Sequence, residues 1–317
     1  MFSNAFRNSA AASVFAFAGL MAQAEPAIVD AAMNGDLKTV RALVRQAVDI
    51  NATQPDGMTA LHWAVERRDL PMMSVLLDAG AKHDLTNRTG ARPLYLAATN
   101  GDAAAIARLL DAGEDANALL TAEGESVLML TSQTGNAEAV KVLLDHGANP
   151  NTQQLRGQTA LMWAAAEGHA DVVKLLLARG ADPGLSSTAS TKPERRPPGG
   201  MTALLFASRQ GKLEAARALL DAGADPKATW KDDWNNPFTL ITGVIGEGEG
   251  REPRHPHAAE LATLLIERGA DPFDTQSLYN TSLHHDDTFW LELLYSRSEA
   301  AGNAERWRSK AAWSRLR

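Results

Sequence analysis

The chain has 317 residues, no cysteine, a formal net charge of −7 and a hydrophobic content of 45%. The missing cysteines exclude disulfides, thiolate metal sites and a cysteine nucleophile, and the acidic balance argues against a nucleic-acid partner, which requires a basic surface. The sequence also lacks a phosphate-binding glycine loop and the serine-hydrolase and zinc-protease motifs, so we expect neither an enzyme nor a bound cofactor.

The first 24 residues have the features of a secretory leader. Arg7 is their only charged residue, an apolar run extends from Ala10 to Leu20, and residues 22–24 have the small-x-small form of a cleavage site. We therefore expect residues 1–24 to be a signal peptide cleaved after Ala24, which would place the protein in the periplasm or outside the cell. A disordered start and a membrane anchor are the alternatives, although this run is too short to span a bilayer. No later stretch is long and apolar enough to cross a membrane.

Two sequence markers then recur, at first about every 33 residues and later at wider intervals. One is a string that reads Thr-Ala-Leu-His-Trp-Ala at 59–64 and Thr-Ala-Leu-Met-Trp-Ala at 159–164. The other is a Gly-Ala-Asp-like string, preceded by apolar residues spaced as on one face of a helix, such as Val140, Leu143 and Leu144. Its glycines are Gly80, Gly113, Gly147, Gly180, Gly223 and Gly269. The pattern predicts units built from two helices and a turn.

These joint markers resemble those of the ankyrin repeat family, whose first helix begins with Thr-Pro-Leu-His-x-Ala. The resemblance covers roughly residues 26 to 295 and implies an all-α solenoid of stacked helix-turn-helix units with β-hairpin or finger loops. We expect Thr59, Thr159 and Thr202 to cap first helices, and His62 to brace neighbouring backbone. One unit cannot bury its apolar stripe alone, so adjacent units must share a core.

Differences between units set the expected boundaries. The repeat domain spans 25–296 and begins with a solvated cap at 26–50. Clear repeats are expected at 51–83, 84–116, 117–150, 151–183 and 199–226, a degenerate unit at 227–272 and a partial unit at 273–296. Residues 184–198, rich in Ser, Thr and Pro, are expected to extend a finger loop.

The degenerate unit is expected to hold helices at 238–245 and 258–268, joined by a long loop rich in Gly and Pro. Histidines and aspartates in and after this unit are the one cluster that could ligate zinc or a similar ion, and they are His255, His257, His284, His285, Asp286 and Asp287. Adjacent histidines point to different sides, so we expect no metal there.

The last segment, 297–317, is basic. Six of its residues are Lys or Arg and two are Glu, with Trp307 and Trp313 among them. Such a segment suits weak contact with an anionic membrane surface or a partner. The alternative is a loosely packed terminal helix.

The resemblance implies a protein-binding surface on the concave side, formed by finger tips and first helices. Trp63, Leu96, Leu130, Trp163 and Phe206 share one position there, where packing between repeats is favoured over an aromatic groove. In the finger at 227–237, tryptophans have little core to join and suit partner anchoring. The alternative is that this extra loop folds back on its own repeat. The candidate residues are Met58, Glu66, Arg67, Arg88, Asn100, Glu125, Gln133, Arg156, Gln158, Glu167, Arg209, Gln210, Trp230 and Trp234.

The sequence therefore predicts an exported, non-catalytic protein–protein interaction module with a protein partner that it does not identify. Two other classes stay open. One is a metal-binding or enzymatic protein that uses the inserted loops and the histidine cluster. The other is a secreted effector that engages host proteins.

Overall fold

The computed structural model describes residues 27–188, 199–231, 237–246, 255–273, 277, 288–300, 302 and 304–308. The predicted signal peptide at 1–24 lies outside this range, as do Trp234, Trp313 and the histidine pair at 284 and 285. The chain forms two compact units. The first comprises residues up to Ala97 together with Ala104–Glu114, and the second comprises Ala98–Ala103 and the chain from Asp115 onward.

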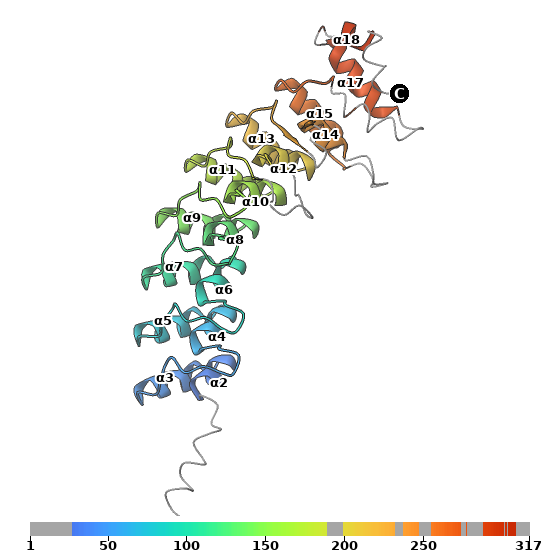
Figure 1. Cartoon of the computed structure of the whole chain (residues 1–317). Helices are drawn as coiled ribbons and strands as arrows, with labels where there is room; N and C mark the ends of the chain where they lie inside the picture. The colour runs from blue at the N-terminus through green and yellow to red at the C-terminus, as the bar shows by residue number, and fades with distance from the viewer. Residues whose placement is uncertain are drawn as a thin grey trace, which may run out of the picture. The chain divides into compact units, whose positions relative to one another are not determined.

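The first unit stacks helix pairs. Its helices are α2 (Ala27–Met33), α3 (Leu37–Arg45), α4 (Ala60–Glu66) and α5 (Leu70–Asp78), with most of α6 (Pro93–Thr99) and α7 (Ala103–Asp111). Within it, α2 packs on α4 and α3 packs on α5, so first helices and second helices form separate rows (Figure 1).

The second unit continues the same pattern. Its helices are α8 (Val127–Gln133), α9 (Ala137–Asp145), α10 (Ala160–Glu167), α11 (Ala170–Ala178), α12 (Ala203–Arg209), α13 (Leu213–Asp221), α14 (Leu240–Ile245), α15 (Ala258–Glu267), α17 (Phe289–Ala300) and α18 (Ala304–Arg308). The first helices α8, α10, α12 and α14 pack in one row, and the second helices α9, α11, α13 and α15 pack in the other. The predicted all-α stack of helix-turn-helix units is confirmed.

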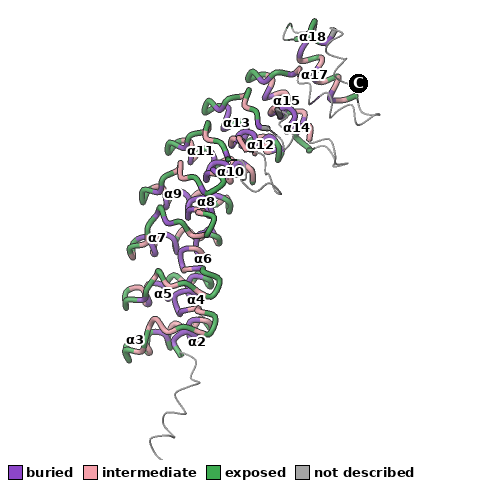
Figure 2. Tube along the Cα trace, in the orientation of Figure 1, coloured by how far each residue is buried: buried purple, intermediate pink, exposed green. Residues whose placement is uncertain are grey.

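Most of the first helices start at a hydroxyl cap. The side chains of Thr59, Thr159 and Thr202 each accept a hydrogen bond from the backbone N–H three residues later, as predicted, and Ser126 does the same. The leucine two residues after each cap then turns inward and is buried. Figure 2 shows buried residues along the helices and exposed residues at the turns. The core is therefore a continuous layer within each unit.

His62 ties two repeats of the first unit together. Its Nδ1 accepts from the Thr59 backbone N–H (3.2 Å), and its Nε2 lies 3.1 Å from the Ala91 carbonyl oxygen. Because a carbonyl only accepts, Nε2 carries the proton and the ring is neutral. Burial lowers the pKa of His62, partly offset by the bond to Ala91. The prediction that this side chain braces neighbouring backbone is confirmed.

The degenerate unit differs from the prediction at its finger. Strands β1 (Thr229–Lys231) and β2 (Pro237–Thr239) pair antiparallel with Trp230 opposite Phe238, and Thr239 caps α14. The helix expected at 238–245 therefore begins at Leu240.

The same hairpin corrects the role proposed for Trp230. Its side chain is only 3% exposed, its ring centroid lies 5.0 Å from that of Phe238, and a Cβ at Gly243 would lie 3.5 Å from its ring. The hairpin folds back on α14, so this tryptophan has a core to join. The prediction that Trp230 anchors a partner is wrong.

The expected boundary between 296 and 297 falls inside a helix, because α17 continues to Ala300. Trp307 of α18 is 4% exposed and packs edge-on against Phe273 and Tyr295, with ring centroids 5.3 and 5.6 Å away. Arg306 pairs with Asp271 at 2.9 Å. This part of the basic tail is neither loosely packed nor free to present Trp307 to a membrane surface.

Candidate functional site

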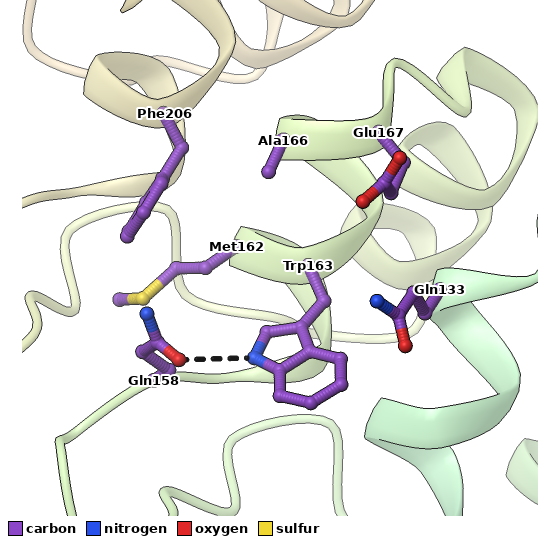
Figure 3. A pocket seen from close by; sticks show the side chains of 7 residues that line it. All are labelled: Gln133, Gln158, Met162, Trp163, Ala166, Glu167 and Phe206. Atoms are coloured by element: carbon purple, nitrogen blue, oxygen red, sulfur yellow. Dashed lines mark hydrogen bonds between the residues drawn. The ribbon is translucent and has the colours of Figure 1, made fainter. Parts of the chain in front are cut away.

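A hollow opens on the first-helix row of the second unit. Its cavity volume is about 180 Å³, and its lining combines apolar side chains with two amides and one carboxylate (Figure 3). The lining residues are Gln133, Gln158, Met162, Trp163, Ala166, Glu167 and Phe206. They come from the end of α8, the finger before α10, α10 itself and α12. We call this site the α10 hollow.

Helix α10 supplies the floor of the hollow because its cap sets which residues face outward. With Thr159 as the cap, Met162, Trp163, Ala166 and Glu167 fall on one side of the helix, as two adjacent pairs four residues apart. Residues on the opposite side, such as Leu161, enter the core. Met162 is only 1% exposed and Trp163 is half-buried, so the floor is largely apolar.

A chain of hydrogen bonds fixes the indole in the hollow. The Trp163 Nε1–H donates to Gln158 Oε1 at 3.3 Å, and Gln154 Nε2 donates to the same oxygen at 3.0 Å. Gln154 is itself buried. The orientation of Trp163 is therefore set by the finger loop before α10. Trp63 in the first unit shows the same design, with its Nε1–H donating to Gln54 Oε1 at 2.9 Å.

Glu167 is the only charged residue among those that line the hollow. It is exposed, and among the described residues its carboxylate has neither an ion pair nor a hydrogen bond. It is also the last residue of α10, where the negative end of the helix dipole disfavours a carboxylate. The carboxylate of Glu167 is therefore available for contact at the rim of the hollow.

The structure brings three of the predicted site residues, Gln133, Gln158 and Glu167, together at the hollow. Of the row for which packing was favoured, Trp163 and Phe206 also line it. Sequence reasoning missed Met162, because this motif position is an ordinary core position in other repeats.

Other predicted residues of the second unit do not line the hollow. Arg156, Arg209 and Gln210 are exposed, and Glu125 and Asn100 are half-buried.

In the first unit, two predicted arginines bridge neighbouring repeats. Arg67 Nη1 donates to the Met33 carbonyl at 3.2 Å, and Arg88 Nη2 donates to the Pro55 carbonyl at 2.5 Å. Glu66 is exposed and Met58 half-buried. These contacts give the arginines a structural role besides any binding role.

The histidine cluster is described only in part. The rings of His255 and His257 are 6.3 Å apart, and His255 lies against Gly211, where burial lowers the pKa of its imidazole. The described residues contain no group of three or more His, Asp or Glu side chains placed to hold a metal ion. They also contain no helix with both the length and the apolarity that a membrane span requires.

Family models of ankyrin repeats match the chain. The model described as "Ankyrin repeats (3 copies)" matches residues 28–119 and 94–187, and "Ankyrin repeats (many copies)" matches 163–220. Together the matches extend from residue 28 to residue 220, which is more than half of the chain.

Curated relatives share short stretches with it. Ankyrin repeat domain-containing protein 40 of mouse is 37% identical over 68 residues, 21% of this chain and 19% of the relative. The nuclear factor NF-kappa-B p105 subunit of chicken is 40% identical over 81 residues, 25% of this chain and 8% of the relative. The chain therefore spans less than a fifth of the length of these two relatives.

Solved structures share the fold over a larger part. The ankyrin repeat domain of human ASB11 aligns with a TM-score of 0.60 and 24% identity, covering 77% of this chain and 97% of that domain. An ankyrin repeat domain from Acinetobacter baumannii AYE aligns with a TM-score of 0.54 and 28% identity, covering 62% and 98%. These likenesses agree with the stacked helix pairs of the two units.

Proposed function

Because the chain belongs to the ankyrin repeat family, whose fold is generally a scaffold for protein–protein interaction, we propose that it is a non-catalytic module that binds another protein. The partner docks on the first-helix row of the second unit, with the α10 hollow at the centre of the contact. The observation that carries this proposal is the hollow itself. An aromatic side chain fixed by hydrogen bonds lies beside a carboxylate that serves no contact among the described residues.

The composition of the hollow favours a protein interface. Interfaces are enriched in aromatic residues and Met at their centre and carry a polar rim. Trp163, Phe206 and Met162 supply the first property, and the two glutamines with Glu167 supply the second. The cavity is smaller than the roughly 300 Å³ at which small-molecule sites begin, so it suits one side chain of a partner.

Affinity capture from the envelope fraction of the native cell tests this function. The wild-type chain and Glu167→Arg, which places a bulky opposite charge at the exposed rim, are immobilised in equal amounts. Glu138→Arg is the matched control, because Glu138 is likewise exposed but belongs to the second helix α9 and does not line the hollow. We expect a protein that wild type and the control retain and Glu167→Arg loses. Equal recovery by all three would reject the α10 hollow, and no specific protein would reject the scaffold function.

We also propose that the protein is exported. The support is the leader pattern of residues 1–24, an apolar run followed by small residues at 22 and 24. In the periplasm or outside the cell the partner would be an envelope or extracellular protein.

A further inference from the structure

We propose that the α10 hollow binds an arginine side chain of the partner. This inference rests on the proposed function and adds the chemistry that the site recognises. Three properties of the hollow carry it: its aromatic walls, its single negative charge and the spread of its hydrogen-bond acceptors.

The aromatic walls suit a flat cation. Trp163 is held in one orientation by Gln158, and Phe206 approaches from the neighbouring helix α12 (Figure 3). A guanidinium group stacks on aromatic faces and is more weakly hydrated than an ammonium group, so it loses less on leaving water. The methylene stem of arginine would cover the thioether of Met162.

The charge of Glu167 decides against an apolar ligand. Covering the hollow with an apolar side chain would desolvate this carboxylate without giving it a partner, which opposes binding. A cationic side chain supplies the missing partner. Arg156, in the finger before α10, and Arg209, at the end of α12, do not line the hollow.

The acceptors favour arginine over lysine. The Glu167 carboxylate and the Gln133 side-chain amide are both without a hydrogen bond among the described residues, and they come from different helices. A guanidinium presents five N–H donors in a plane and can reach two acceptors at once, while an ammonium group is a point charge.

A displayed library of random nine-residue peptides tests the inference on the full chain. We expect selection to enrich arginine at one fixed position. In a synthetic peptide from that selection, replacing this arginine with citrulline, its neutral isostere, should weaken binding about five- to tenfold at low salt. The penalty should fall to about two- to threefold with Glu167→Gln, because the ion pair is lost while stacking on the aromatic rings remains. It should persist with Glu138→Gln, an equal charge change on an exposed residue of α9, away from the hollow.

The outcomes separate this inference from the proposed function. Enrichment of lysine, aromatic or aliphatic residues at the fixed position would overturn the arginine assignment and leave the binding function intact. An equal citrulline penalty in wild type and Glu167→Gln would place the arginine elsewhere and overturn the site. Selection of no peptide that binds the chain specifically would overturn both.

Discussion

Ala47 occupies a position that glycine fills in every later repeat, and replacing it should stabilise the protein. It follows the C-cap of α3, as Gly147 follows that of α9, and both have a left-handed backbone, with φ of 53° and 84°. A Cβ in this conformation costs about 1–2 kcal/mol. Glycine also raises the conformational entropy of the unfolded chain, which offsets about 0.4–1 kcal/mol of the stabilisation. Ala47→Gly should therefore raise the free energy of unfolding by about 0.5–1 kcal/mol.

At Ala47, backbone conformation should be the main effect of the substitution. Its side chain is exposed, so removing the methyl group loses little burial. Because repeats interact mainly with their neighbours, the gain should concentrate in the terminal helices α2 and α3. Hydrogen exchange of their amides should slow about two- to fivefold, which is the factor that 0.5–1 kcal/mol represents.

Two further variants decide whether backbone conformation is the cause. Ala42→Gly, at an exposed position inside α3, should destabilise by about 1 kcal/mol, because there φ is helical. Gly147→Ala should destabilise the second unit by an amount similar to the Ala47→Gly gain. If Ala47→Gly loses stability as Ala42→Gly does, the left-handed strain assigned to Ala47 is refuted.

Three other outcomes follow from the structure and the sequence. Trp230→Ala should lower the free energy of unfolding measured in urea by about 3 kcal/mol, because the ring is buried in the core of its unit; unchanged stability would reject that packing. N-terminal sequencing of the native protein should begin at Glu25, and an intact Met1 in the soluble cytoplasmic fraction would end the export proposal. Burial holds the pKa of His62 below its ordinary value of 6.5. The stability that the neutral ring contributes is therefore complete above about pH 6.5 and is lost as the pH falls below it. His62→Gln should flatten this dependence of the free energy of unfolding, measured by urea titration between about pH 7.5 and 5.5.

The roles that the sequence predicted correctly depend on short-range contacts or on a position fixed by the repeat motif. Thr159 caps the helix that starts beside it, and His62 reaches the next repeat from a position fixed by the motif. The predictions for Trp230 and Trp307 were wrong because each side chain packs against a segment that comes close only in the folded chain. Trp230 meets Phe238 across a hairpin, and Trp307 of α18 meets Phe273, which follows α15 in the chain. No local pattern encodes either contact.

The α10 hollow was predictable only in part for a related reason. Alignment of repeats places Gln133 and Glu167 on one row, since they follow the same motif. The alignment does not show that Met162 lines an opening, because this depends on the sizes of side chains from three neighbouring helices. An open hollow is a property of the stack and not of one repeat.

Glu167 should reveal a conflict between stability and binding. The carboxylate ends α10 next to the C-cap glycine, facing the negative pole of the helix dipole. Glu167→Gln should therefore raise the free energy of unfolding by about 0.3–1 kcal/mol at low salt, with the gain shrinking as salt screens it. The same variant should weaken partner binding, so the two measurements move in opposite directions. If the carboxylate instead stabilised the fold, Glu167→Gln would lower the free energy of unfolding in urea titrations. That result would remove the strongest reason to place binding at this hollow.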